Sequence, residues 1–148
     1  MWSCPACGAR FVQRNLSHSC VRVSIDDFLA GKPPVAVALF HRFVAEVRTL
    51  GPVLLHPVKT RVALMVEVRF ASINRFGRDD IDGHLWLKER VDSDKFRRVD
   101  ELGRDFIHHF RMTDPTFLDR EFRGYLAQAY AIGRREHLPA RKKKPARR

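Results

Sequence analysis

The thiols of this chain are confined to one end. All three cysteines lie within the first twenty residues, Cys4 and Cys7 in a C-x-x-C turn and Cys20 two residues after His18. A tetrahedral zinc ion takes thiolate and imidazole ligands, and short segments without a core of their own fold when it binds. The sequence therefore predicts a zinc site whose ligands are Cys4, Cys7, His18 and Cys20.

The spacing of these ligands argues for a structural ion over other uses of the thiols. A single residue separates His18 from Cys20, so the site differs from a standard zinc ribbon or finger. A redox C-x-x-C follows a strand, and the three residues before Cys4 leave no room for one. A disulfide framework would leave one cysteine unpaired. Because protein groups fill all four positions, we expect structural and not catalytic zinc.

The positive charge of the chain is concentrated at its two ends. The net charge is +11, but residues 141–148 hold six basic side chains and no acid, and residues 1–20 hold two more, which leaves +3 for residues 21–140. The segment 139–148 is self-repelling and has nothing to bury, so we expect disorder there. Its residues Arg141, Lys142, Lys143 and Lys144 would attract phosphates by counterion release, or would serve only as a solubilising terminus.

The length of 148 residues suits one ordinary domain with a small appendage, and the cytoplasm is the expected location. The hydrophobic content of 45% suffices for a core. No apolar run approaches the roughly 20 residues of a membrane span, and no targeting segment is visible, so we expect no membrane partner. The predicted division is a zinc knuckle over 1–23, a main domain over 24–138 and a basic tail over 139–148.

Hydrophobic periodicity predicts an α+β main domain. Ser24 is the expected N-cap of a short first helix, Pro33 and Pro34 begin a second, and Asp114 with Pro115 begins the last. Between them, period-two alternation predicts four or five antiparallel strands that form one layer of a two-layer sandwich, with helices on one face. The predicted helices are 24–30, 33–50 and 115–137, the predicted strands are 53–57, 61–70, 84–90, 96–99 and 106–112, and a loop is predicted over 74–83.

Several motifs along the chain occur together in one known family. They are Trp2-x-Cys4-Pro5-x-Cys7-Gly8, Ser17-His18-Ser19-Cys20, Phe28-Leu29-x-Gly31-Lys32-Pro33-Pro34, Lys59-Thr60-Arg61, Phe96-Arg97-Arg98-Val99, His108-His109 and Ala129-Tyr130-x-Ile132-Gly133. In these motifs the chain resembles a family of small bacterial proteins that carry the domain of unknown function 5655. The resemblance covers nearly everything before the basic tail. It implies one compact domain behind a zinc knuckle, and it supplies no activity and no catalytic residues.

The alternation also predicts what the uncovered face of the sheet displays. Apolar residues facing the helices are predicted to be Val62, Leu64, Val66, Val68, Leu85, Leu87, Phe106 and Phe110. The opposite face would then show Arg61, Met65, Glu67, Arg69, His84, Trp86, Lys88, His109 and Arg111. A tryptophan among cations can stack a base and neutralise phosphates. An ordinary solvated sheet face also accounts for the cations, but it leaves Trp86 as a large exposed aromatic.

Histidines and acids on the strands and loops suggest two further sites. His108 and His109 point to opposite faces, so they cannot share a metal. We expect His108 in the core with a hydrogen-bond partner, and His109 beside His84 if their strands are neighbours. Asp79, Asp80, Asp82 and Glu89 with Lys88 have the composition of a metal-dependent nuclease site, although acids in a glycine-flanked loop are more often turn formers.

These observations favour a non-enzymatic binding protein with structural zinc. It would engage nucleic acid through phosphate contacts with low sequence specificity. Two alternatives stay open: a protein-interaction or small-ligand-binding module with purely structural zinc, and a metal-dependent hydrolase or nuclease. The candidate binding residues are Arg61, Arg69, Trp86, Lys88, His109, Arg111 and the tail residues Arg141, Lys142, Lys143 and Lys144.

Overall fold

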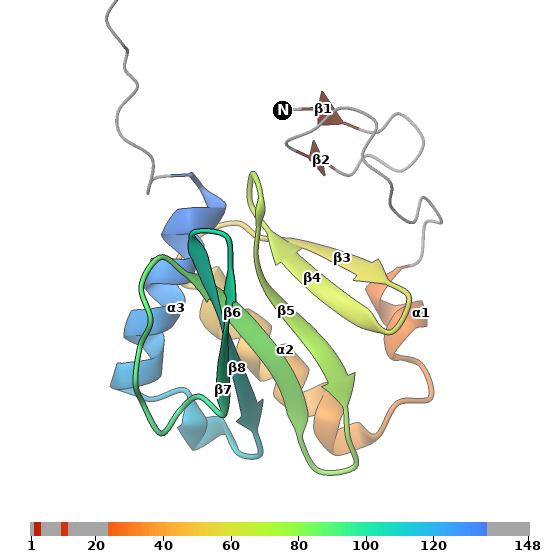
Figure 1. Ribbon diagram of the computed structural model, residues 1–148. Helices are drawn as coiled ribbons and strands as arrows, with labels where there is room; N and C mark the ends of the chain where they lie inside the picture. The colour runs from red at the N-terminus through yellow and green to blue at the C-terminus, as the bar shows by residue number, and fades with distance from the viewer. Residues whose placement is uncertain (1, 4–9, 12–23, 136–148) are drawn as a thin grey trace, which may run out of the picture.

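The computed structural model describes residues 2–3, 10–11 and 24–135 (Figure 1). Near the N-terminus, β1 (Trp2–Ser3) pairs antiparallel with β2 (Arg10–Phe11). The predicted zinc ligands Cys4, Cys7, His18 and Cys20 lie outside the described residues, as does the basic tail.

The main domain is a six-stranded antiparallel sheet with helices packed on one face (Figure 1). The strand order is β3-β4-β5-β6-β8-β7. The helices α2 and α3 both contact the central strands β5 and β6. In chain order the elements are α1 (Ile25–Leu29), α2 (Pro34–Arg48), β3 (Leu54–Val58), β4 (Arg61–Met65), β5 (Arg69–Phe76), β6 (Ile81–Leu87), β7 (Arg98–Leu102), β8 (Asp105–Met112), the 3₁₀ helix η1 (Pro115–Phe117) and α3 (Arg120–Gly133). The predicted α+β class is therefore confirmed, with more strands than the four or five predicted.

The additional strand arises where the sequence predicts one long strand over 61–70. The chain instead reverses at residues 66–68, so that β4 and β5 form a hairpin. The backbone amides of Glu67 and Val68 both donate to the carbonyl of Gly133, at 2.8 and 3.1 Å, and this anchors the turn to the end of α3. Val66 remains partly buried against the core, so apolar alternation continues through a turn that contains no glycine, proline or asparagine. The apolar alternation therefore gave no sign that the chain reverses at residues 66–68.

The predicted loop over 74–83 is also mostly strand. β5 continues to Phe76 and β6 begins at Ile81, and these two residues pair. Gly83, which we interpreted as a loop residue, lies within β6, where a Cβ would come within 2.5 Å of the Ser72 carbonyl oxygen. Glycine here marks a close approach of two backbones and not a turn.

The ends of the helices follow local capping, with one correction. Ser24 caps α1 as predicted, since its hydroxyl accepts a 3.0 Å hydrogen bond from the amide of Asp27. Asp114 caps the short η1 helix, and it is Asp119 whose carboxylate accepts from the amide of Phe122 and begins α3. The last helix therefore starts five residues later than predicted and ends at Gly133. The edge strand β7 likewise covers 98–102 where 96–99 was predicted.

The core lies between the sheet and the two long helices. Phe43 from α2, Phe110 from β8 and Phe122 from α3 are each fully buried and in mutual ring contact, with centroids 5.1 to 6.5 Å apart. A buried phenylalanine contributes up to about 3 kcal/mol by removing its ring from water. Among the residues predicted to face the helices, Val62, Leu64, Leu85, Leu87 and Phe110 are buried in this core, whereas Phe106 is only half-buried. None of the helices within residues 24–135 packs on the other face of the sheet.

Candidate functional site

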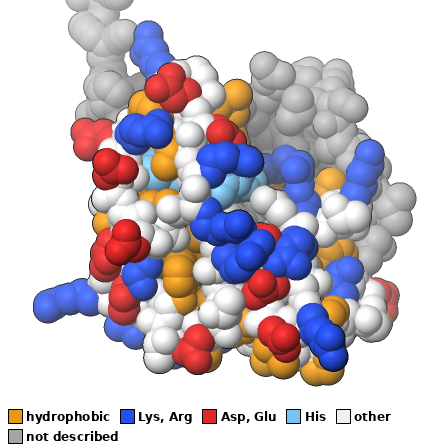
Figure 2. Space-filling model, turned by 60° about the horizontal axis from the view of Figure 1, so that its bottom comes forward, with side chains coloured by type: hydrophobic (Ala, Val, Ile, Leu, Met, Phe, Trp, Pro, Cys, Tyr) orange, Lys and Arg blue, Asp and Glu red, His pale blue; other side chains and the backbone are white. Residues whose placement is uncertain are grey.

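Histidines from neighbouring strands meet on the open face of the sheet. Along one row of the register, Ser72 on β5 pairs with His84 on β6, and His84 pairs with His109 on β8. Residues that pair directly across strands share a face, so the three side chains lie on the same side. The rings of His84 and His109 have centroids 5.5 Å apart, as expected for neighbouring strands. Figure 2 shows histidine surface between basic side chains on this side of the molecule.

A hollow of about 210 Å³ opens on this face above β4, β5 and β6. We call it the basic hollow, and its lining residues are Arg61, Ala63, Arg69, Ala71, Ser72, His84, Trp86, Leu102 and Ile107. Trp86 is half-buried and lies on the face away from the helices, where the sequence placed it. Its ring therefore forms part of a concave surface that water can reach.

The basic hollow carries two positive charges. Arg61 is exposed and Arg69 is half-buried. Burial, and secondly the charge of Arg61, lower the pKa of Arg69 below its ordinary value. No aspartate or glutamate of the described chain lines the hollow. The two guanidinium groups therefore give this part of the face a positive potential.

A chain of hydrogen bonds fixes the tautomer of His84, and the surroundings of the ring keep it neutral. The hydroxyl of Ser72 donates to Asn74 Oδ1 at 2.6 Å, and Asn74 Nδ2 donates to His84 Nδ1 at 2.9 Å. Burial, His109 and Arg61 together lower the pKa of His84 to about 4, so its ring is neutral at neutral pH. Because Nδ1 accepts a hydrogen bond, the single ring proton of His84 is on Nε2.

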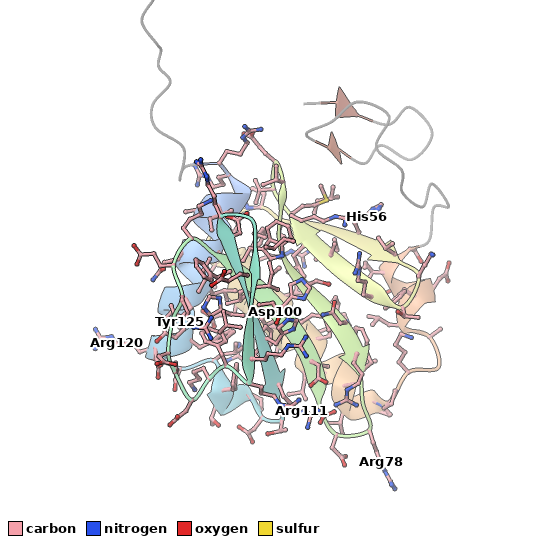
Figure 3. The ribbon with its side chains drawn as sticks, in the orientation of Figure 1. His56, Arg78, Asp100, Arg111, Arg120 and Tyr125 are labelled. Carbon is pink, nitrogen blue, oxygen red and sulfur yellow. The ribbon has the colours of Figure 1, made fainter. Side chains whose placement is uncertain are left out.

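Asp100 and Arg98 of the edge strand β7 both contact His109. Its Nε2 lies 2.9 Å from the carboxylate of Asp100, which Arg98 also contacts at 3.2 Å. The hydrogen bond from His109 is the main cause that lowers the pKa of Asp100. Figure 3 labels Asp100 on the edge of the open face. His109, a predicted binding residue, thus belongs to a polar cluster beside the basic hollow and does not line it.

The remaining cations predicted for binding are paired with carboxylates. Lys88 lies 2.5 Å from Asp105. Arg111 binds Asp82 at 2.8 Å and approaches Asp80 at 3.4 Å, and Figure 3 labels it near the end of β8. Arg75 binds the same two aspartates, each at 2.7 Å. We call Arg75, Asp80, Asp82 and Arg111 the arginine–aspartate cluster, in which positive and negative charges balance.

The structure thus unites three predicted site residues and separates the others. Arg61, Arg69 and Trp86 line one hollow, whereas Lys88, His109 and Arg111 do not. Two further residues predicted for the open face differ: Met65 pairs with Arg69 on that face but is buried, and Glu67 lies in the turn between β4 and β5.

Two of the four carboxylates considered for a nuclease site are paired with arginines. Asp80 and Asp82 both bind guanidinium groups, and Glu89 lies beyond the end of β6. Within residues 24–135, no group of three or more histidine, cysteine, aspartate or glutamate side chains could hold a metal ion.

His108 is a core histidine, as predicted. It is fully buried, its Nε2 accepts a 2.9 Å hydrogen bond from the amide of Val91, and its Nδ1 lies 3.1 Å from the carbonyl of Phe106. Burial is the main cause that lowers its pKa.

Sequence reasoning missed Ser72 and Asn74, which set the tautomer of His84. Both lie in the part of β5 after Phe70, which the sequence assigned to a gap and a loop. A signal was present, since Ser72 is a polar residue inside an apolar run that also contains Ala71 and Ile73. A buried polar side chain at such a position requires a partner.

The fold and the hollow define a class: an α+β domain with an open antiparallel sheet whose free face carries a small basic hollow. The chain belongs to the family described as a domain of unknown function, DUF5655, whose model matches residues 25–133. Comparison with curated proteins and with solved structures gives no match. Among the described helices, none has the length and apolar character to cross a bilayer.

Proposed function

We propose that this protein binds nucleic acid through phosphate contacts on the open face of its sheet, with low sequence specificity. The observation that supports this most is the composition of the basic hollow. Arg61 and Arg69 lie there beside Trp86, and no described carboxylate lines the hollow. Other basic residues of the same face, Lys88 and Arg111, are already paired with aspartates.

Phosphate is the ligand group that best satisfies two neighbouring guanidinium groups. Arginine presents planar donors that match phosphate oxygens, and a charge-assisted hydrogen bond is about twice as strong as a neutral one. The pKa of Arg69 is lowered by burial and secondly by Arg61, so an anion bound in the hollow would offset the like-charge effect of Arg61. Each phosphate neutralised on a single strand adds ~0.7 to the slope of log affinity against log salt.

Two parts of the proposal lie outside the described residues. The basic tail, through Arg141, Lys142, Lys143 and Lys144, would add phosphate contacts without sequence choice. Zinc held by Cys4, Cys7, His18 and Cys20 would fasten the N-terminus, and the antiparallel pairing of β1 with β2 on either side of Cys4 and Cys7 supports such a turn. Metal analysis tests it: one zinc per chain is expected, and Cys7→Ser should lose it.

Salt titration with matched variants tests the nucleic-acid proposal. The full chain is titrated with a labelled single-stranded oligonucleotide at several salt concentrations. Arg61→Gln should weaken binding about tenfold and reduce the salt slope by ~0.7, since one phosphate contact is lost.

Arg111→Gln is the control. It removes the same charge from the same face, but Arg111 is neutralised by Asp82 and Asp80, so affinity should change little. Equal losses in both variants would mean that bulk charge, and not the basic hollow, holds the nucleic acid. Affinity that is independent of salt would refute phosphate contacts altogether.

The concave shape of the site also favours a second candidate, a small-ligand-binding module. The basic hollow is an open concavity and not a flat surface, and it combines an aromatic ring with two cations. A free nucleoside monophosphate would then bind as tightly as an oligonucleotide. Affinity that increases with strand length instead supports nucleic acid.

A further inference from the structure

We infer that the basic hollow receives one unpaired base, stacked against Trp86 and hydrogen-bonded by the Nε2–H group of His84. The inference rests on the proposed function, because phosphate contacts would bring the strand to the face. It goes further by naming the substrate class, single-stranded nucleic acid in preference to a duplex.

The size of the hollow suits a single ring system. Its volume of about 210 Å³ is below the roughly 300–1,000 Å³ of pockets that enclose drug-sized ligands. A small side chain leaves room in the hollow: Ala63, which pairs with Ser72 on the open face, lines it and is almost fully buried. Ile107, on β8, completes the apolar part of the lining. A flat aromatic molecule can therefore enter beside the indole ring.

Stacking of a base on Trp86 would supply binding energy and would accept any base. Every base has a π-face, so stacking on an aromatic side chain strengthens binding for any base. A base inside a duplex is already stacked on its neighbours and must be flipped out before it can reach such a site. Trp86 on a concave surface therefore favours strands whose bases are free.

His84 adds a directed hydrogen-bond donor to the same hollow. Asn74 holds Nδ1 as an acceptor, so the proton is on Nε2, and no described residue accepts a hydrogen bond from that atom. The hydroxyl of Ser72 is engaged by Asn74. The Nε2–H group of His84 and the guanidinium of Arg61, which both belong to residues that line the hollow, are hydrogen-bond donors. Base edges and phosphates both supply acceptors.

A probe with phosphates but no bases separates this inference from the proposed function. The chain contains two tryptophans, so the background variant Trp2→Phe makes Trp86 the only one. Its fluorescence and affinity are measured with three ligands of about 12 nucleotides, within the range of site sizes of single-strand binders. The ligands are an oligothymidylate, an abasic strand with the same phosphates, and a duplex. The oligothymidylate should quench Trp86 and bind about tenfold more tightly than the abasic strand.

Two variants and a control attribute the difference to the stack. Trp86→Leu should abolish the preference for the oligothymidylate over the abasic strand, whereas Trp86→Phe, which retains a ring, should keep most of it. Arg61→Gln should weaken both strands equally. Circular dichroism establishes that each variant is folded.

The outcomes are distinguishable. If the abasic strand and the oligothymidylate bind equally and Trp86 is not quenched, base insertion is wrong and phosphate binding stands. If the duplex quenches Trp86 and binds as tightly as the single strand, the substrate class is wrong. If none of the three ligands binds, the proposed function fails as well.

Discussion

Two pairs of arginines lie on the same face of the sheet and differ in what surrounds them. Arg75 and Arg111 share the carboxylates of Asp80 and Asp82 at distances of 2.7 to 3.4 Å. Arg61 and Arg69 line a hollow with an aromatic ring and no described carboxylate. The same residue type thus lies among carboxylates at one end of the face and beside an aromatic ring at the other.

The difference shows why charge counts are a poor guide to a binding surface. Asp82 is held ionised in the cluster: burial opposes its charge, but hydrogen bonds from Arg111 and Arg75 outweigh this and lower its pKa. In the basic hollow the charges act in the opposite sense, since Arg61 adds to the burial that lowers the pKa of Arg69. In the cluster the neighbouring charges have opposite signs, whereas in the basic hollow the two guanidinium groups have the same sign.

The largest expected effect is on the pH dependence of the free energy of unfolding, and it comes from His84 in the basic hollow. His84 has a folded-state pKa of about 4 against 6.5 when unfolded, so between these values the unfolded chain binds more protons. Stability should therefore fall as the pH falls from about 6.5 to about 4, by ~3 kcal/mol from His84 alone. Denaturant unfolding at several pH values measures this.

The variant His84→Gln isolates this contribution. Its unfolding free energy should depend less steeply on pH in that window, whatever its absolute stability. His108, whose pKa is also lowered by burial, is present in both proteins and cancels in the comparison. Identical slopes for the two proteins would show that the ring of His84 is not held neutral.

The layers of the fold could be predicted from the sequence because they depend on local periodicity. Val62, Leu64 and Leu85 follow the period of a half-buried strand, and all three are fully buried under the helices. The hairpin between β4 and β5 could not, since its turn is stabilised by the carbonyl of Gly133, a contact between residues far apart in the chain. A turn fixed by tertiary contact needs no turn-forming residues.

The candidate site, like the fold, could be predicted from the sequence only in part. The pleat alone places Trp86 and Arg61 on the open face, because alternation fixes the face of each side chain. Which cations are neutralised depends on strand order: Arg111 meets Asp82 because β8 pairs with β6, and sequence spacing does not show this pairing. Binding residues could therefore be assigned to a face, but the available ones could not be told from the paired ones.

A carboxylate placed in the hollow should make it resemble the arginine–aspartate cluster. Leu102 lines the hollow and is 56% exposed, so Leu102→Asp should be tolerated by the fold. The new charge would pair with the guanidinium groups and compete with phosphate, and oligonucleotide affinity should fall about fivefold, equivalent to ~1 kcal/mol. Leu102→Asn, of nearly the same shape and without charge, is the control and should bind almost normally. Equal losses in the two variants would implicate the leucine side chain and not the charge.

Removing a carboxylate from the arginine–aspartate cluster should have the smallest effect on oligonucleotide affinity. Asp82→Asn removes the carboxylate that Arg75 and Arg111 share, and leaves them near Asp80 alone. The cluster then gains a positive charge that phosphate can neutralise, so affinity at low salt should rise about twofold and the salt slope should steepen. The gain should disappear at high salt, because these groups are exposed and screened. Oligonucleotide titrations of Asp82→Asn and the parent protein at two salt concentrations measure it. An unchanged affinity at low salt would mean that bound nucleic acid does not reach this end of the face, and that the contacts are confined to the basic hollow.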